Sequence, residues 1–491
     1  MPLTDAALKK LLRTGKDLFH TAVDSQNDSL VQKRIAKAVV KHIGKRNRRI
    51  EKNTLKIKRN RAVDDEEIRD QGFTRPCALL LCSSRARAVC LLKQAMKHRK
   101  AKNKKRLAED FDTNRFDDCF LLGCKLQKIR TIFYAPLQKS DCIVATPLGL
   151  ANAVEKDRKV VDFLSSIELL WIDRAETLAM QNWATLLGIV ENIAARPSKT
   201  HGSDINRIKT VFLDGKGRES LTTILTSTVE LPEINKMLRL SQNTRGKEKI
   251  ETDRRAETID FSCGFVFVDG KTIGDCAENR HKLFTQRIQD ETDLLYLSLA
   301  KKQKGNAKYS RNSCVVVSSH EEFEKLKKHF EDSSYSLGAV SEYTDTDKAT
   351  KTFSRFINRN TQLLLVTERA CFYSGFSPRC CDAIFFYSLP SLPKIFSGVC
   401  RTGFTETEAP VCVSFFSVFD SIKLKMLLGA ENTKTLLKKR GLAMKHTDGK
   451  TVRIYGRDSL AALYQHPLLP KKEPGNKQSF GIKHVTNKQT K

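Results

Sequence analysis

The sequence predicts an α/β protein with two doubly wound parallel-sheet domains, preceded by a basic helical arm. Its 491 residues are enough for two or three domains that each bury a core. From residue 77 onward, short runs rich in leucine or β-branched residues alternate with stretches of helical length. This alternation occurs on both sides of a polar, strongly charged segment from Gln242 to Glu257. Continuous apolar strands that alternate with helices indicate parallel sheets covered on both faces.

The charge of the chain points to a polyanionic partner. It carries 87 Lys and Arg against 56 Asp and Glu, a formal charge of +31. Basic surfaces gain affinity by releasing counterions from phosphates, so nucleic acid is the leading candidate. An anionic membrane is the rival, but no apolar stretch reaches the length of a membrane span, and Met1 to Lys16 carries charges where a signal peptide needs apolar residues. We therefore expect a soluble intracellular protein.

Residues 1–72 are expected to form the basic arm. Apolar side chains fall at helical spacing between residues 5 and 50, among them Leu18 and Phe19, so this whole range is expected to be helical. Thirteen cations lie between Lys33 and Arg61 against a single acid, Glu51. So dense a run repels itself without a counter-charge, which favours an arm that lies on RNA through Lys45, Arg46, Arg48 and Arg49. The alternative is a solvated basic helix face.

The apolar runs then divide the chain into domains. We expect the first domain at 73–250, a connecting segment at 251–295, the second domain at 296–470 and a basic disordered tail at 471–491. The strands of the first domain are expected at Ala78 to Cys82, Cys119 to Gly123, Asp141 to Thr146, Ile167 to Ile172 and Thr222 to Thr226. Those of the second are expected at Cys314 to Ser318, Leu363 to Thr367, Ala383 to Tyr387 and Val411 to Phe416.

The segment Asp173-Arg174-Ala175-Glu176 follows a predicted strand at the position where an RNA helicase carries Asp-Glu-Ala-Asp. Such an ATPase needs the first Asp to hold hydrated Mg²⁺ and the next residue, Glu, to orient the attacking water. Arg174 can do neither, so the chain resembles a helicase that has lost its catalytic residues.

Six further segments resemble elements of DEAD-box helicases, and all seven occur in the correct order. Doubly wound sheets bind ligands at the carboxyl ends of their strands, where these segments fall. The resemblance implies two RecA-like domains. The other segments are Cys82 to Arg87, Asp141 to Gly149, Thr226-Ser227-Thr228 with Leu231 to Ile234, Val315 to His320, Leu364 to Arg369, and Cys400 to Gly403.

The phosphate loop G-x-x-x-x-G-K-T is missing from the sequence. Upstream of Pro76 only Ile43-Gly44-Lys45-Arg46 comes near it, and Gly270-Lys271-Thr272 has the wrong spacing and follows a strand-like run. Around Arg401 the last arginine element is also altered, with Gly398 and Phe404 where arginines belong. We therefore expect no catalytic residue and no cofactor; a divergent ATPase that uses Lys45 and Asp173 is the alternative.

Residues at the predicted carboxyl edges retain groups that suit sugar and phosphate oxygens. Each hydroxyl has a second interpretation as a helix N-cap. The cysteines lack zinc-ligand spacing, so no metal site is expected. The candidate RNA-binding residues are Ser83, Ser84, Arg85, Arg87, Thr146, Pro147, Gly149, Ser318, Ser319, Thr367 and Arg369.

Further segments are more similar to one protein family than to helicases in general. They include Arg69 to Pro76, Val161 to Glu168, Met180 to Trp183, His201 to Asp204, Arg245 to Lys247, Ser341 to Tyr343 and Phe385 to Pro390. From about residue 30 to 430 the chain resembles the U3 small nucleolar RNA-associated protein 25 family, also called digestive organ expansion factor. The resemblance implies a nucleolar pseudo-helicase of the small-subunit processome, with pre-rRNA or U3 snoRNA and processome proteins as partners and no DNA or membrane. A protein-only adaptor that reuses the helicase fold is a further alternative.

Overall fold

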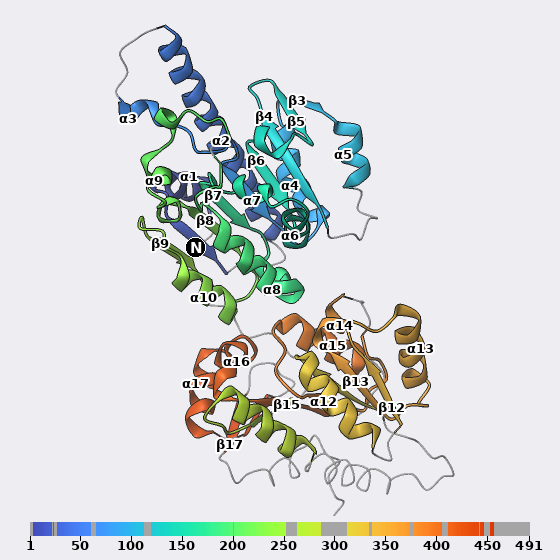
Figure 1. Ribbon diagram of the computed structural model, residues 1–491. Coiled ribbons are helices and arrows are strands. Elements are labelled where there is room, and N and C mark those ends of the chain that lie inside the picture. Colours follow the sequence, from blue (N-terminus) through green and yellow to red (C-terminus); the bar gives the residue numbers. More distant parts are fainter. Residues whose placement is uncertain are drawn as a thin grey trace, which may run out of the picture. The chain divides into compact units, whose positions relative to one another are not determined.

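The computed structural model divides the chain into two compact units, Met1–Arg255 and Ala256–Lys491 (Figure 1). The structure describes residues 3–21, 23, 27–59, 65–111, 119–199, 201–251, 263–285, 312–332, 336–373, 377–404, 411–440, 442–445 and 452–455. The expected tail at 471–491 lies outside the described residues.

The first unit contains a nine-stranded sheet in the order β3-β5-β4-β6-β2-β7-β8-β1-β9. All neighbouring strands are parallel except β4, which runs antiparallel to β5 and β6. The strands are β1 Asp17–His20, β2 Ala78–Leu81, β3 Lys100–Lys102, β4 Leu121–Leu126, β5 Arg130–Phe133, β6 Cys142–Ala145, β7 Leu169–Ile172, β8 Thr222–Thr226 and β9 Lys247–Ile250.

Helices cover this sheet, which confirms the predicted α/β class. Residues of β2, β6 and β7 are buried along their whole length, as expected for strands covered on both faces. The helices are α1 Asp5–Thr14, α2 Asp28–Lys58, α3 Asp65–Ile68, α4 Arg85–Met96, α5 Lys104–Asp110, α6 Pro147–Lys156, α7 Lys159–Asp162, α8 Ala175–Asn192, α9 Thr210–Leu213 and α10 Pro232–Leu240.

The N-terminal region is part of the first unit and not a separate arm. Residues 17–20, expected to be helical, form the buried strand β1, which pairs in parallel with β8 and β9. Asp17, at the start of β1, is fully buried and accepts hydrogen bonds from the Thr223 amide and the Asn243 side chain, each at 2.8 Å. These contacts are more than 200 residues away in the sequence, so local periodicity could not reveal them.

Helix α2 is the longest helix of the described chain, about 46 Å at 1.5 Å per residue. One face of it, with Ile35, Val39 and Ile43, is buried in the core that α1 and α4 share with the sheet. The basic side chains lie mainly on its other faces. Burial of an apolar stripe therefore fixes α2 to the first unit along much of its length.

The second unit contains an eight-stranded sheet in the order β12-β13-β11-β14-β15-β10-β16-β17. Its first six strands are parallel, and β16 and β17 extend the edge in antiparallel fashion. Strand β10 lies within the expected connecting segment 251–295, so the second unit begins earlier than the sequence suggested. The strands are β10 Cys263–Phe267, β11 Ser313–Val317, β12 Leu337–Val340, β13 Leu363–Thr367, β14 Ala383–Phe386, β15 Val411–Phe416, β16 Leu442–Lys445 and β17 Val452–Tyr455.

An aromatic cluster forms part of the core of the second unit. Phe284 is fully buried and makes edge-on contacts with the rings of Tyr387 and Phe415, at 5.0 and 5.6 Å between centroids. In the part of the chain that the structure describes, no helix has both the length and the hydropathy that crossing a bilayer requires. The helices of this unit include α12 His320–Glu331, α13 Thr346–Ile357, α14 Glu368–Tyr373, α15 Pro393–Gly403, α16 Ser421–Leu428 and α17 Ala430–Lys439.

Candidate functional site

The helicase-like elements of the first unit meet at the carboxyl edge of its sheet. Strands β2, β7, β8 and β1 are neighbours in this order, so the residues that follow them lie side by side. Asp173 follows β7, and Thr226 ends β8. The amide of Ser227 donates to the carbonyl of His20 at 2.9 Å, which joins the ends of β8 and β1.

Strand β1 and helix α2 are consecutive elements of the first unit, the kind of pair that a phosphate loop would join. In phosphate-loop proteins this loop joins a strand to the start of a helix and holds the nucleotide on backbone amides. Here the connecting sequence is Thr21-Ala22-Val23-Asp24-Ser25-Gln26-Asn27, without glycine or lysine. The helix then begins with a carboxylate, Asp28. Because the segment lacks the glycine pattern, the sequence does not identify it as the counterpart of a phosphate loop. Only strand β1, Asp17–His20, which the structure reveals, does so.

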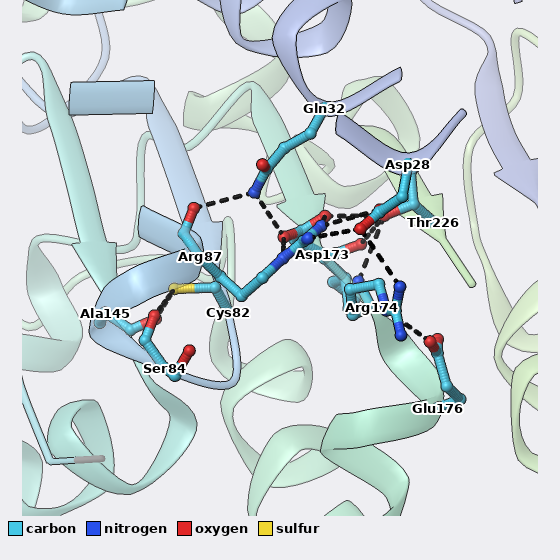
Figure 2. A network of polar contacts seen from close by, with 11 residues as sticks. Asp28, Gln32, Cys82, Ser84, Arg87, Ala145, Asp173, Arg174, Glu176 and Thr226 are labelled. Carbon is cyan, nitrogen blue, oxygen red and sulfur yellow. Dashed lines mark hydrogen bonds and ion pairs between the residues drawn. The ribbon is translucent and has the colours of Figure 1, made fainter. Parts of the chain in front are cut away.

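A single guanidinium, that of Arg87, joins two carboxylates in this site (Figure 2). Its Nε and Nη2 donate to Asp173 at 2.7 and 3.0 Å, and its Nη1 and Nη2 donate to Asp28 at 2.7 and 3.1 Å. Burial disfavours the charge, but hydrogen bonds and attraction from Asp173 and Asp28 raise the pKa of Arg87 above its ordinary value. Arg87, predicted to contact RNA, is therefore held inside the protein by two carboxylates.

Both oxygens of the Asp173 carboxylate are occupied by protein donors. Besides Arg87, Oδ2 accepts from the Gln32 side chain at 3.0 Å, and Oδ1 accepts from the Thr226 hydroxyl at 3.1 Å. The carboxylate is 1 % exposed. Gln32 and Asp28 are both residues of α2 that the sequence analysis did not select.

Arg174, the residue after Asp173, lies in the same network. Its backbone is left-handed, with φ of +57°, and its Nη1 donates to Asp28 at 3.2 Å. Its Nε pairs with Glu176 at 2.6 Å, and Thr228 donates to the same Glu176 oxygen at 2.9 Å. Figure 2 shows Arg174 between the two carboxylates. Ala175 begins α8 and is buried, and the Ser227 hydroxyl bonds the Val229 carbonyl.

The network places two guanidinium groups among three carboxylates and pairs each carboxylate with at least one of them, while Oε2 of Glu176 is left without a hydrogen-bond partner. A Mg²⁺–triphosphate does not fit this arrangement. Phosphates at the start of α2 would meet the carboxylate of Asp28, and Mg²⁺ would have to displace the donors that occupy Asp173. Within the described residues, no three His, Cys, Asp or Glu side chains are grouped to hold a metal ion.

The other candidates on this edge mostly have structural roles. Arg85 donates to the Cys119 carbonyl at 3.0 Å and lies over the rings of Phe111 and Phe120. Ser83 is buried, while Ser84 precedes α4 without capping it through its side chain.

The Thr146-Pro147-Gly149 element is buried. Thr146 caps α6, because its hydroxyl accepts a hydrogen bond from the Gly149 amide at 3.1 Å. Of the two roles considered for this hydroxyl, the structure has the helix N-cap. Pro147 occupies the first turn of α6, and a side chain at Gly149 would collide with the backbone of Phe120.

Candidates of the second unit line the carboxyl ends of β11 and β13. Thr367 is buried and donates to Glu342 at 2.8 Å, and Arg369 pairs with the same carboxylate at 3.5 Å. Ser318 donates to the Leu389 carbonyl, and Ser319 lies exposed before α12. Arg401 is exposed on α15.

The basic candidates on α2 divide into one buried and three exposed residues. Arg46 is buried and pairs with Glu168 at 3.3 Å. Lys209 pairs with the same carboxylate at 2.7 Å, and although burial opposes the charge, Lys209 and Arg46 lower the pKa of Glu168 to about 2. Lys45, Arg48 and Arg49 are exposed.

Two units, each with a mainly parallel sheet covered by helices, define an α/β protein of the RecA-like fold class. A family model described as UTP25, NTP hydrolase-like domain matches residues 15–117 and 111–248, and one described as Utp25, C-terminal domain matches residues 261–445. The chain belongs to the UTP25 family.

Relatives named U3 small nucleolar RNA-associated protein 25 are similar over most of this chain. The protein of Arthroderma benhamiae is 28% identical over 463 residues, which cover 87% of this chain and 64% of the relative. The protein of Schizosaccharomyces pombe is 27% identical over 468 residues, with 87% and 69% covered. The chain thus spans slightly less than two thirds of the first of these. Among solved structures, S. cerevisiae Dbp5 bound to RNA and ADP BeF3 aligns with 86% of this chain and 89% of its own, at 11% identity and a TM-score of 0.28.

Proposed function

We propose that this chain is a catalytically inactive, helicase-like scaffold in the assembly of the small ribosomal subunit. It binds pre-rRNA or U3 snoRNA together with small-subunit processome proteins in the nucleolus, and it takes part in maturation of 18S rRNA. Membership in the UTP25 family, the names of the relatives and the charge of +31 support this proposal. Exposed cations on α2 and the serines that precede α4 and α12 supply groups that suit phosphate oxygens.

The proposal that the chain is catalytically inactive depends on one observation, the contact of Arg87 with both Asp173 and Asp28. An ATPase of this class needs a free carboxylate for hydrated Mg²⁺, a cationic loop for the phosphates and a base for water. Asp173 is hydrogen-bonded to protein on both oxygens, Asp28 is anionic at the start of α2, and Arg174 cannot accept a proton. Ion pairs within the chain thus occupy the groups that a nucleotide and its Mg²⁺ would need.

The proposed RNA contacts change in the light of the geometry. Arg87 and Arg46 are held by carboxylates and are no longer proposed to touch RNA. Ser84, Ser319, Lys45, Arg48 and Arg49 remain the proposed contacts, since the serines precede helices and the cations are exposed.

The test is ATP binding and turnover by the purified full chain, with and without structured RNA. We expect no saturable binding of Mg²⁺–ATP and no phosphate release above that of buffer, while RNA binding persists. Turnover that Asp173→Asn abolishes would overturn the catalytic part of the proposal. Absence of RNA binding at low salt would overturn the RNA part and favour a protein-only adaptor.

A further inference from the structure

The exposed face of α2 carries a regular stripe of cations. Its members recur every three or four residues, so each turn of the helix presents one of them on the same side. Over 18 residues the stripe extends about 27 Å at 1.5 Å per residue. The stripe consists of Arg34, Lys37, Lys41, Lys45, Arg48 and Lys52.

One side of the stripe borders a hollow of about 860 Å³ between α1 and α2. Lys9 and Arg13 of α1 line its far wall. Its two acidic residues already have partners: Asp5 pairs with Lys37 and Arg34, and Glu168 pairs with Arg46 and Lys209. The remaining cations give this hollow a large excess of positive charge.

The other side of the stripe borders a second hollow of about 400 Å³, between α2, the end of α4 and the turn from β4 to β5. Lys97 and Lys128 line it from these two elements, together with the amide side chains of Gln94 and Gln127. Lys41 and Arg48 line both hollows, so the stripe is the ridge between them.

The second half of this basic face lies at the amino edge of the first sheet. Helix α2 starts at the carboxyl edge, where Asp28 meets Arg87, and reaches the opposite edge at Arg46. There Arg46 pairs with Glu168, the residue before β7, and Asn47 donates to the Leu126 carbonyl at the end of the antiparallel strand β4. The ridge is thus separate from the helicase-type edge of the same unit.

We propose that the α2 ridge and its two hollows bind the sugar-phosphate backbone of RNA, a second RNA site besides the carboxyl edge. This inference rests on the proposed RNA binding and names its location. A ridge with one cation per turn and a cationic hollow on each side suits a polyanion that crosses the helix. An acidic protein segment would also need apolar anchors. The large hydrophobic side chains that are exposed in the described chain lie outside both hollows, so the lining favours RNA.

The test neutralises exposed cations in the full chain and measures RNA affinity by fluorescence anisotropy between about 50 and 200 mM salt. The ridge variant is Lys41→Gln, Lys45→Gln, Arg48→Gln, and the hollow variant is Lys97→Gln, Lys128→Gln. The matched control is Lys216→Gln, Lys236→Gln, Arg239→Gln, which removes the same charges from exposed positions outside both hollows. Unchanged thermal unfolding confirms that each variant is folded.

We expect the ridge variant to bind RNA at least about tenfold more weakly. The slope of log affinity against log salt concentration should fall by about 2 to 3 in the ridge variant and by about 1 to 2 in the hollow variant. The control should retain nearly all of its affinity. Equal losses in ridge and control, or no loss in the ridge variant while wild type binds RNA, would overturn the site and leave the proposed function standing. Competition by poly-glutamate as effective as competition by RNA would overturn the choice of RNA. If wild type binds no RNA, the proposed function fails first.

Discussion

The guanidinium of Arg87 bonds the carboxylate of Asp173 side-on, with Nε to Oδ2 at 2.7 Å and Nη2 to Oδ1 at 3.0 Å. The same guanidinium also reaches Asp28 on another helix, 59 residues away in the sequence. One cation therefore ties together β7, α4 and the start of α2. The pair is a structural contact, because removing one partner would leave a buried charge uncompensated.

Replacing Arg87 with Met should strongly destabilise the first unit. The change leaves Asp173, which is 1 % exposed, without its main counter-charge, and breaking a buried pair from one side costs about 3 to 5 kcal/mol. Chemical denaturation gives the free energy of unfolding. Lys93→Met, at an exposed position on the same helix, is the control and should change it by less than about 0.5 kcal/mol. Equal values for the two variants would contradict a structural role for the pair.

Arg174→Glu restores the Asp-Glu order of a helicase but should not restore activity. The new carboxylate would lie beside Asp28 and Glu176, which now pair with Arg174, and like charges there repel. We expect stability to fall by about 2 to 4 kcal/mol, with no ATP turnover. Phosphate release with RNA present and denaturation together check this. Arg174→Gln, which removes the charge without reversing it, should lose less stability. Turnover by the Glu variant would mean that a phosphate site survives.

Apolar runs predicted much of the fold, because a strand buried on both faces is apolar along its whole length. The nine predicted runs all overlap strands, and the edge elements lie where parallel strands end. The sequence does not predict strand β1, because its four residues also fit helical spacing with their neighbours. Its pairing with β8 depends on contacts 206 residues away.

The candidate site was harder to predict than the strands. The sequence revealed Asp173 and Arg174 through their order after a strand, but not what surrounds them. Charge alone does not identify the partner of a cation, so the sequence predicts an RNA contact for Arg87; its partners Asp28 and Asp173 lie 59 and 86 residues from it. The same holds for Arg46, which pairs with Glu168. Long-range ion pairs leave no period or spacing in a sequence.

The half-buried carboxylate of Glu168 should make the first unit sensitive to acid. Burial raises its pKa, but Lys209 and Arg46 outweigh burial and lower the pKa to about 2 from an ordinary value of 4.5. The stabilisation is therefore complete above about pH 4.5 and is lost as the pH falls toward 2, up to about 3 kcal/mol. Unfolding free energy measured against pH tests this. Glu168→Gln should be less stable at neutral pH and should flatten that part of the curve; an unchanged slope would contradict the assignment.

Gly149→Ala should destabilise the first unit for reasons of packing, whatever its effect on RNA. The amide of Gly149 donates to Thr146 at the start of α6, and a β-carbon there would collide with the backbone of Phe120. Because backbone atoms cannot move aside as a flexible side chain can, we expect a loss of about 2 to 4 kcal/mol.

Gly188→Ala is the matched control for this substitution. Gly188 lies inside α8, is exposed, and has open space where a β-carbon would be added. Alanine in a helix interior is favoured over glycine by about 1 kcal/mol, so this variant should gain stability. Thermal and chemical denaturation of both variants would give shifts of opposite sign. If Gly149→Ala unfolded like wild type while RNA affinity fell, Gly149 would belong to an RNA contact and its tight packing against Phe120 would be wrong.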